Sequence, residues 1–182
     1  MRDRRPGTEV HVGYLDHGSP LLTDLNTRDA VVVPLLLSSG FHVHADIPTA
    51  APGASIAGAV GPDTALAAAI ADRLREAGWS GETPVVLAAT GSADPQSNAD
   101  VRTAADQLAA ELGVAVTAAF VSGGKPALAD SGAAAVASYL IAPGHFADEI
   151  ASCGAAIVSA PIGVDPRVAD VICARYDAQL LT

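Results

Sequence analysis

Apolar runs alternate with helical patterns through the second half of the chain. Val85–Ala89 is a continuous apolar run, typical of a strand buried on both faces of a parallel sheet. Residues 100–112 repeat apolar positions with the spacing of an amphipathic helix. Further strands are predicted at 114–121, 134–141 and 155–159, with a short helix before the second of these. Alternating strands and helices predict a parallel sheet with right-handed crossovers.

The first half carries a similar apolar run, and two histidines follow it. Residues 31–37 are typical of a buried strand, and Ser38-Ser39-Gly40 predicts a turn directly after it. His42 and His44 come next. The crevice at the C-terminal ends of parallel strands is where α/β sheets bind ligands, so His42 is the first candidate for chemistry.

The chain shows an internal repeat with a period of about 100 residues. Residues 61–74 align with 163–176, and both segments have helical apolar spacing. Asp63 and Asp165 are predicted N-caps, with Pro166 at the first helical position. Two shorter blocks align in the same order further upstream. The first pairs 36–40 with 140–144 and the second pairs 14–16 with 120–122.

The repeat predicts an α/β fold of two lobes joined near residues 76–83. The N-terminal lobe spans 8–78 and the C-terminal lobe spans 84–182. A counterpart of 84–113 would fall before residue 8, so we expect the N-terminal lobe to lack its first strand and helix. Each lobe should have a parallel sheet, and the first sheet should be one strand short of the second.

Composition restricts the possible functions. Half of the 182 residues are apolar and 16 % are charged, so the chain can build a large core. The longest apolar runs are far shorter than the ~20 residues of a membrane helix, and no secretory signal follows Met1, so a cytoplasmic location without membrane contact is expected. Cys153 and Cys173 are predicted to be small buried hydrophobes. The net charge of −10 argues against nucleic acid as a partner.

Several motifs together resemble the sirohydrochlorin chelatases, the class II chelatases that include CbiX and SirB. They are Tyr14-Leu15-Asp16, the run from Val33 through Gly40-Phe41-His42-Val43, then Asp46-Ile47-Pro48 and Gly61-Pro62-Asp63. The resemblance implies two flavodoxin-like lobes across a cleft, with parallel sheets covered by helices on both faces. It also implies insertion of Co²⁺ or Fe²⁺ into sirohydrochlorin, in cobalamin or siroheme biosynthesis. The divalent metal is then a substrate, the tetrapyrrole is the partner, and no organic cofactor is expected.

The resemblance also suggests roles for particular residues. His42 matches one of two metal-binding histidines of the family, and Asp16 lies where the family has an acidic residue at a strand end. The other family histidine lies in a His-Gly-Ser motif after the first strand. His17-Gly18-Ser19 spells that motif but follows a different strand, so we do not take it as the equivalent.

Further candidates depend on local geometry. His44 shares a face with His42, as an auxiliary metal ligand, if this segment is extended. Lys125, the one lysine beside nine arginines, could contact substrate carboxylates. Thr90, Gly91 and Ser92 stand where the second half would carry the His-Gly-Ser motif, and their backbone N–H groups could bind a carboxylate. For each of these residues, an ordinary loop position is the alternative. His11 and His145 are predicted to be surface residues.

Two other functions remain open at this stage. The chain could be a catalytically inactive tetrapyrrole- or metal-binding protein of the same fold, or a flavodoxin-like domain used for protein contacts. No GxxxxGK[ST] or GxGxxG motif follows a predicted strand, which argues against nucleotide binding. A sheet lacking a strand would favour association, so a homo-oligomer is possible.

Overall fold

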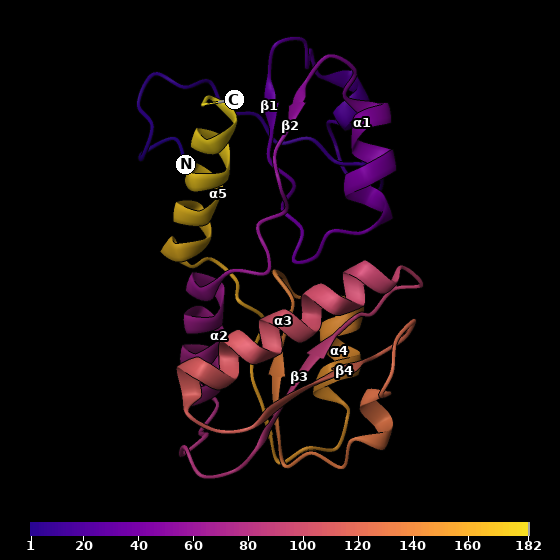
Figure 1. Cartoon of the computed structure of the whole chain (residues 1–182), viewed down its shortest axis with the longest axis vertical. Coiled ribbons are helices and arrows are strands. Elements are labelled where there is room, and N and C mark those ends of the chain that lie inside the picture. Colours follow the sequence, from indigo (N-terminus) through magenta and orange to yellow (C-terminus); the bar gives the residue numbers. More distant parts are fainter. Residues whose placement is uncertain (182) are drawn as a thin grey trace.

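The structure of the protein is a computed structural model that describes residues 1–181. It contains two sheets of parallel strands, which follow one another along the long axis of the molecule (Figure 1). The larger sheet has the strand order β4-β3-β5-β6 and the smaller one pairs β1 with β2. The strands of the larger sheet are β3 (Val85–Ala89), β4 (Val116–Phe120), β5 (Ala135–Ser138) and β6 (Ile157–Val158). The smaller sheet consists of β1 (Val31–Val32) and β2 (Ser55–Ile56). The predicted α/β class with parallel sheets is therefore confirmed.

The central strand of the larger sheet is β3, as its continuous apolar run predicts. Val85 pairs with Val116 on one side and with Ala135 on the other, in parallel register. Alternate residues of a strand point to opposite faces. Accordingly Leu87 packs in the main core, whereas Val86 packs in a second cluster on the opposite face. The sheet is thus buried on both faces.

Helices cover both faces of this sheet. The two long ones on the main-core face are α2 (Thr64–Glu76) and α3 (Pro95–Leu112), and α4 (His145–Ala151) contributes Ile150 to the opposite face. Three predicted strands are shorter than expected, because pairing stops within residues 114–121, 134–141 and 155–159. The short helix predicted before β5 is η3 (Leu128–Asp130).

Helix starts follow the capping pattern of the sequence. The Asp63 carboxylate accepts a hydrogen bond from Ala65 N–H, and Asp165 accepts one from Arg167 N–H. The last helix, α5 (Pro166–Gln179), begins at Pro166 as predicted. By contrast, α3 begins earlier than expected, at Pro95, because Asp94 provides an N-cap and proline suits the first helical position.

The last helix of each half of the chain contacts the other half, and α5 also contributes Val168 and Val171 to the main core. Leu66, Ile70 and Leu74 of α2 are fully buried in the core of the larger sheet. In turn α5 contacts β1 and α2, and it lies beside the smaller sheet (Figure 1). The two parts are therefore held together by contacts of α2 and α5 as well as by the chain connection. The predicted lobe bounds, 8–78 and 84–182, stay a prediction.

The first half differs most from expectation. Of the apolar run 31–37 only Val31–Val32 forms a strand, and Tyr14 makes only an isolated bridge with Leu21. The smaller sheet thus has two strands fewer than the larger one, not one fewer. The reason lies in the strand order, because β4 is held in the larger sheet only by β3. Within residues 1–181 the smaller sheet has no counterpart of β3, so the segment corresponding to β4 has no strand to pair with.

Local features still recur in the two halves. The Tyr14–Leu21 bridge is followed by η1 (Leu22–Asp24), and the Phe120–Ala127 bridge is followed by η3. A repeat of two whole lobes stays a prediction, because the sheets of the two halves are unequal.

Candidate functional site

A cavity of about 430 Å³ lies where the two halves of the chain meet. The first half contributes residues 35–38 and 40–42, and the second half contributes 89–92, Ser97, Val101 and 139–141. Thr90 follows the end of β3 and Tyr139 follows the end of β5. The cavity therefore occupies the C-terminal edge of a parallel sheet, where α/β folds bind ligands. It brings together His42 and the three candidates Thr90, Gly91 and Ser92.

His42 stands at the start of a helical turn. The segment after Gly40 forms η2 (His42–Asp46), a π-helical turn, followed by α1 (Ile47–Ala50). The His42 side chain is 62 % exposed, and its Nδ1 lies 2.6 Å from Oδ2 of Asp46, one helical turn later. A carboxylate on one imidazole nitrogen orients the ring and increases the basicity of the other nitrogen. This arrangement leaves Nε2 for a metal ion or a proton.

The helical turn removes the basis for His44 as a second ligand. The prediction assumed an extended segment, in which residues two apart share a face. In a helix, residues two apart do not face each other. His44 is exposed and is not among the residues that line the cavity.

Asp16 and Lys125 also lie outside the cavity lining. Both are exposed and occupy loops, after the Tyr14 bridge and after β4 respectively. Within residues 1–181, no group of three or more His, Cys, Asp or Glu side chains could hold a metal ion. Of the predicted metal ligands, His42 is the one that lines the cavity.

The loop at 90–92 forms one wall of the cavity through tight backbone packing. Gly91 has φ of +88°, and a Cβ there would come within 1.8 Å of the carbonyl oxygen of Ser122. The Ser92 N–H donates to Oδ1 of Asn98 at 3.0 Å, and the Asn98 amide donates to Ser92 O and Gly123 O. The Ser92 N–H is therefore already engaged, contrary to the expectation that it would be free for a carboxylate.

Sequence reasoning missed Ser97, Asp100 and Tyr139, which meet the segment before His42. Ser97 lines the cavity from α3 and Tyr139 lines it after β5, while Asp100 accepts a hydrogen bond from the Ser39 N–H. Burial raises the pKa of the Tyr139 hydroxyl above its usual value, and the charges of Asp100 and Asp63 add to the effect. Tyr139 is therefore a neutral donor at ordinary pH. No sequence signal could reveal these contacts, because the partners are 59 to 102 residues apart.

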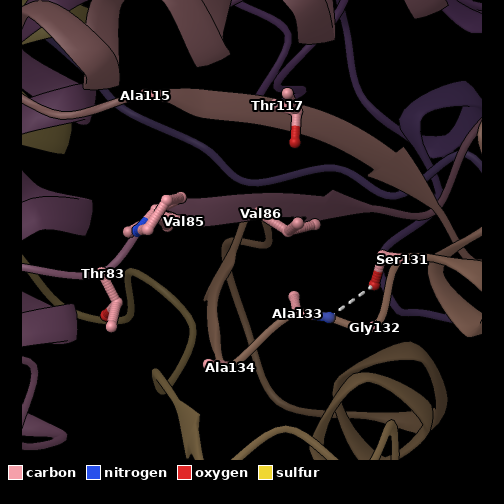
Figure 2. Close-up of a pocket in the computed structure, with 10 residues that line it drawn as sticks. Thr83, Val85, Val86, Ala115, Thr117, Ser131, Gly132, Ala133 and Ala134 are labelled. Atoms are coloured by element: carbon pink, nitrogen blue, oxygen red, sulfur yellow. Dashed lines mark hydrogen bonds between the residues drawn. The ribbon is translucent and has the colours of Figure 1, made fainter.

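A second cavity, of about 340 Å³, lies at the opposite edge of the larger sheet (Figure 2). It is lined by the first residues of β3 and β4 and by the chain just before β5. Its lining residues are Thr83, Pro84, Val85, Val86, Ala115, Thr117 and 131–134. None of them is ionisable, so this cavity offers no group for acid–base or metal chemistry.

The fold is similar to that of solved structures of SirB and CbiX. SirB from Bacillus subtilis with Fe³⁺ matches 98 % of this chain and 84 % of its own length, with a TM-score of 0.79 and 22 % identity. SirB of B. subtilis subspecies spizizenii in complex with cobalt matches 92 % of this chain and 79 % of its own length, with a TM-score of 0.73 and 22 % identity. CbiX, described as the terminal enzyme of siroheme biosynthesis in denitrifying bacteria, matches 88 % of this chain and 80 % of its own length, with a TM-score of 0.62 and 20 % identity.

The sequence itself matches the CbiX family model over residues 1–77. This segment includes the His42 motif, so the resemblance to the CbiX and SirB chelatases is confirmed in the N-terminal sequence as well as in the fold. No curated protein sequence matches the chain. Within the described residues, no helix is both long and apolar enough to cross a membrane.

Proposed function

We propose that this protein is a chelatase that inserts Co²⁺ or Fe²⁺ into sirohydrochlorin. The observation that carries the proposal is the His42–Asp46 pair at the edge of the cavity between the two halves. The CbiX sequence match over this motif and the SirB-like fold support the same reading. Because SirB is described once with Fe³⁺ and once with cobalt, both cobalamin and siroheme biosynthesis are compatible with the proposal.

The chemistry assigned to His42 follows from its surroundings. Neutral imidazole is a suitable ligand for Fe²⁺ and Co²⁺. Insertion also releases two pyrrole N–H protons, and imidazole can accept protons near neutral pH. We assign to His42 Nε2 the contact with the incoming metal and to Asp46 the orientation of the ring. Asp16 stays a prediction as a catalytic carboxylate. His44 as an auxiliary ligand is likewise untested, although the extended segment assumed for it is helical.

The carboxylates of the substrate need cationic side chains that are not already paired with carboxylates of the protein. Six arginines form ion pairs with carboxylates: Arg4, Arg5, Arg73, Arg75, Arg167 and Arg175. Within residues 1–181, no such pair is formed by Arg2, Arg28, Arg102 or Lys125. The Arg102 guanidinium donates to the carbonyl oxygen of Lys125. The loop that contains Lys125 packs on the cavity wall, since a Cβ on Gly123 would come within 2.9 Å of Ser92 N. This placement supports Lys125 as a contact for the substrate.

Metal insertion into sirohydrochlorin, followed by absorbance, tests the proposal. Wild type should convert the tetrapyrrole with Co²⁺ or Fe²⁺ above the uncatalysed rate. His42→Ala should abolish this conversion. His145→Ala should not, because the exposed His145 pairs with Glu149 at 3.0 Å and lies outside the cavity lining. Equal loss in both variants, or full activity in His42→Ala, contradicts the assignment.

The alternative is a binding protein without insertion activity. The observation that favours it is the single histidine in the cavity lining, which would hold a metal weakly. Tetrapyrrole binding by wild type without conversion would support this alternative over the enzyme. Absence of both binding and conversion would favour a domain used for protein contacts.

A further inference from the structure

The segment directly before His42 is held by three side chains from the second half of the chain. Tyr139 Oη donates to the carbonyl oxygen of Leu37 at 2.9 Å. The hydroxyl oxygens of Ser38 and Ser97 lie 2.8 Å apart. The Ser39 N–H donates to Oδ2 of Asp100 at 2.7 Å. Three consecutive residues, 37–39, are therefore each anchored once to α3 or to the end of β5.

This anchored segment sets where the helical turn of His42 begins. The carbonyl oxygen of Gly40 accepts hydrogen bonds from Val43 N–H and His44 N–H. Ser39 is thus the last residue before the turn, and its N–H is fixed from outside. A shift of Ser39 would move the turn, and His42 with it, relative to the wall formed by residues 90–92.

Among the three anchors, Asp100 is the one that carries charge. Its Oδ1 accepts from the Gln96 amide at 3.0 Å, which fixes the carboxylate on the surface of α3, and its Oδ2 accepts from Ser39. A carboxylate is a stronger acceptor for a backbone N–H than a neutral group. Asp100 is also only partly buried, whereas Ser97 and Tyr139 are 7 % and 4 % exposed. It can be replaced with less disturbance of the core.

We propose that Asp100 is a positioning residue that fixes the place of His42 against the cavity wall of the other half. This inference rests on the proposed function, in which His42 contacts the metal and the tetrapyrrole. Asp100 itself touches neither, since it is absent from the cavity lining. It acts through the hydrogen bond from the Ser39 N–H, which joins the two halves of the chain. The position of His42 therefore depends on how the two halves pack against each other.

Three variants on the same helix test the proposal in the full chain. Asp100→Ala removes the acceptor, Asp100→Asn keeps an amide oxygen that can accept from Ser39, and Asp106→Ala removes an exposed carboxylate as the matched control. Displacement of a reacting group by about 1 Å can cost on the order of 100-fold in rate, so kcat should fall about 10- to 100-fold in Asp100→Ala. The KM for the tetrapyrrole should stay the same. Asp100→Asn should restore most of kcat, and Asp106→Ala should behave as wild type.

Two readouts do not depend on activity. Exchange of the Ser39 amide hydrogen, followed by NMR, should be faster in Asp100→Ala than in Asp106→Ala, and the His42 ring resonances should shift. If kcat, Ser39 exchange and the His42 resonances in Asp100→Ala match those in Asp106→Ala, the inference is wrong while the proposed function stands. A change confined to KM, or a loss of activity explained by unfolding in both Asp100 variants, also overturns it.

If wild type itself inserts no metal, the proposed function fails but the positioning role is still decided. A shifted His42 resonance and faster Ser39 exchange in Asp100→Ala then support it. Unchanged signals overturn it.

Discussion

At the scale of single residues, the proposed chemistry of the site rests on the interaction between His42 and Asp46. The two side chains are one helical turn apart, and the carboxylate lies 2.6 Å from Nδ1. A pair with the same spacing occurs at His145 and Glu149, away from the cavity, where Nε2 of the histidine lies 3.0 Å from the carboxylate. Within residues 1–181, two histidine–carboxylate pairs thus span one helical turn, and only one of them adjoins the cavity.

Asp46→Asn should weaken metal binding without unfolding the protein. An amide holds the imidazole less firmly than a carboxylate and lowers its basicity, and loss of such a partner typically costs about 10- to 100-fold in metal affinity. The measurement is titration with Co²⁺, followed by visible absorbance. Glu149→Gln is the matched control and should leave the affinity unchanged. Equal affinities of wild type and Asp46→Asn would show that Asp46 does not support the metal contact.

At the scale of elements, the wall of the cavity depends on the packing of two loops. The loop after β3 and the loop after β4 meet where Gly91 faces Ser122 and Gly123 faces Ser92. The left-handed φ of Gly91 and the short distance to Ser122 O leave no room for a side chain. Because Lys125 lies in the second loop, this contact also places the proposed substrate contact relative to the wall.

Gly91→Ala should destabilise the protein more than Gly113→Ala. Both glycines have positive φ, which costs a non-glycine residue about 1–2 kcal/mol. The Gly113 position has open space around an added Cβ, whereas the Gly91 position would force the two loops apart. Urea unfolding of the two variants gives the comparison, and tetrapyrrole binding should weaken only in Gly91→Ala. Similar free energies of unfolding would mean that the loops separate easily.

The pairing of β1 in the smaller sheet differs from the pairing of β5 in the larger sheet, where β3 lies alongside. In the larger sheet the Tyr139 N–H, just after β5, donates to Ala88 O of β3. In the first half, Leu35 is the corresponding residue and is half exposed. No backbone hydrogen bond of Leu35 to another described residue is present. The apolar run 31–37 therefore extends β1 no further, although its residues favour a strand.

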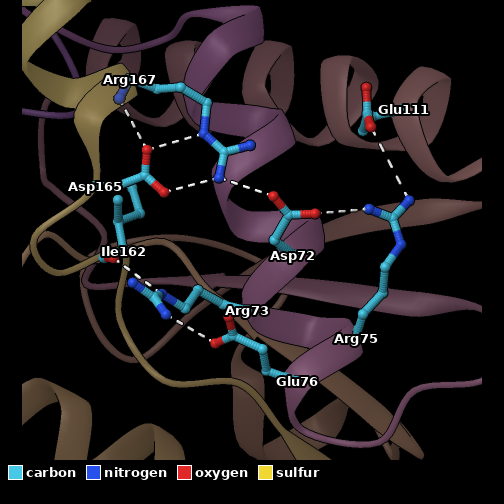
Figure 3. A network of polar contacts seen from close by, with 8 residues as sticks. All are labelled: Asp72, Arg73, Arg75, Glu76, Glu111, Ile162, Asp165 and Arg167. Atoms are coloured by element: carbon cyan, nitrogen blue, oxygen red, sulfur yellow. Dashed lines mark hydrogen bonds and ion pairs between the residues drawn. The ribbon is translucent and has the colours of Figure 1, made fainter.

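At the scale of the whole molecule, ion pairs fasten α5 to the rest of the fold. Arg167 contacts Asp165 at 2.7 Å and Asp72 of α2 at 2.8 Å, and Arg75 extends the network from Asp72 towards α3 (Figure 3). Arg4 and Arg5 of the N-terminal segment pair with Asp170 and Asp177 of α5. The N-terminal segment and α2 thus both form ion pairs with residues of the last helix.

These contacts make stability depend on acidity. The hydrogen bonds from Arg167 hold the pKa values of Asp72 and Asp165 below their usual range, and Arg4 and Arg5 do the same for Asp170 and Asp177. A carboxyl with a lowered pKa in the folded state stabilises the fold above its unfolded pKa of about 3.9. This stabilisation is lost as the pH falls through the folded pKa.

Arg167→Gln should lower the melting temperature at pH 7, and the difference from wild type should shrink below about pH 4. The loss in free energy of unfolding should be on the order of 1 kcal/mol, because Asp72 is half exposed and solvent screens its charge. Thermal unfolding at pH 7 and pH 3 gives the comparison. Arg28→Gln, at an exposed arginine outside the network, is the control. A difference that persists unchanged at pH 3 would mean that Arg167 acts through packing.

The local structure and the chemical motif could be predicted from short stretches of the sequence. Asp63 and Asp165 as helix caps, β3 as a buried central strand and the parallel α/β class all follow from short-range patterns, which depend on neighbouring residues alone. The family resemblance around His42 was also visible, because it lies in one contiguous stretch.

Which residues meet depends on how the two halves of the chain pack together. The apolar run 31–37 reads as a strand, but pairing needs a neighbouring strand, and β1 ends at Val32. Residues 42–46 became helical, so the face assumed for His44 does not exist. Asp100 and Tyr139 reach the segment before His42 from 61 and 102 residues away. Contacts over such distances arise from packing of the two halves, and no local pattern encodes them.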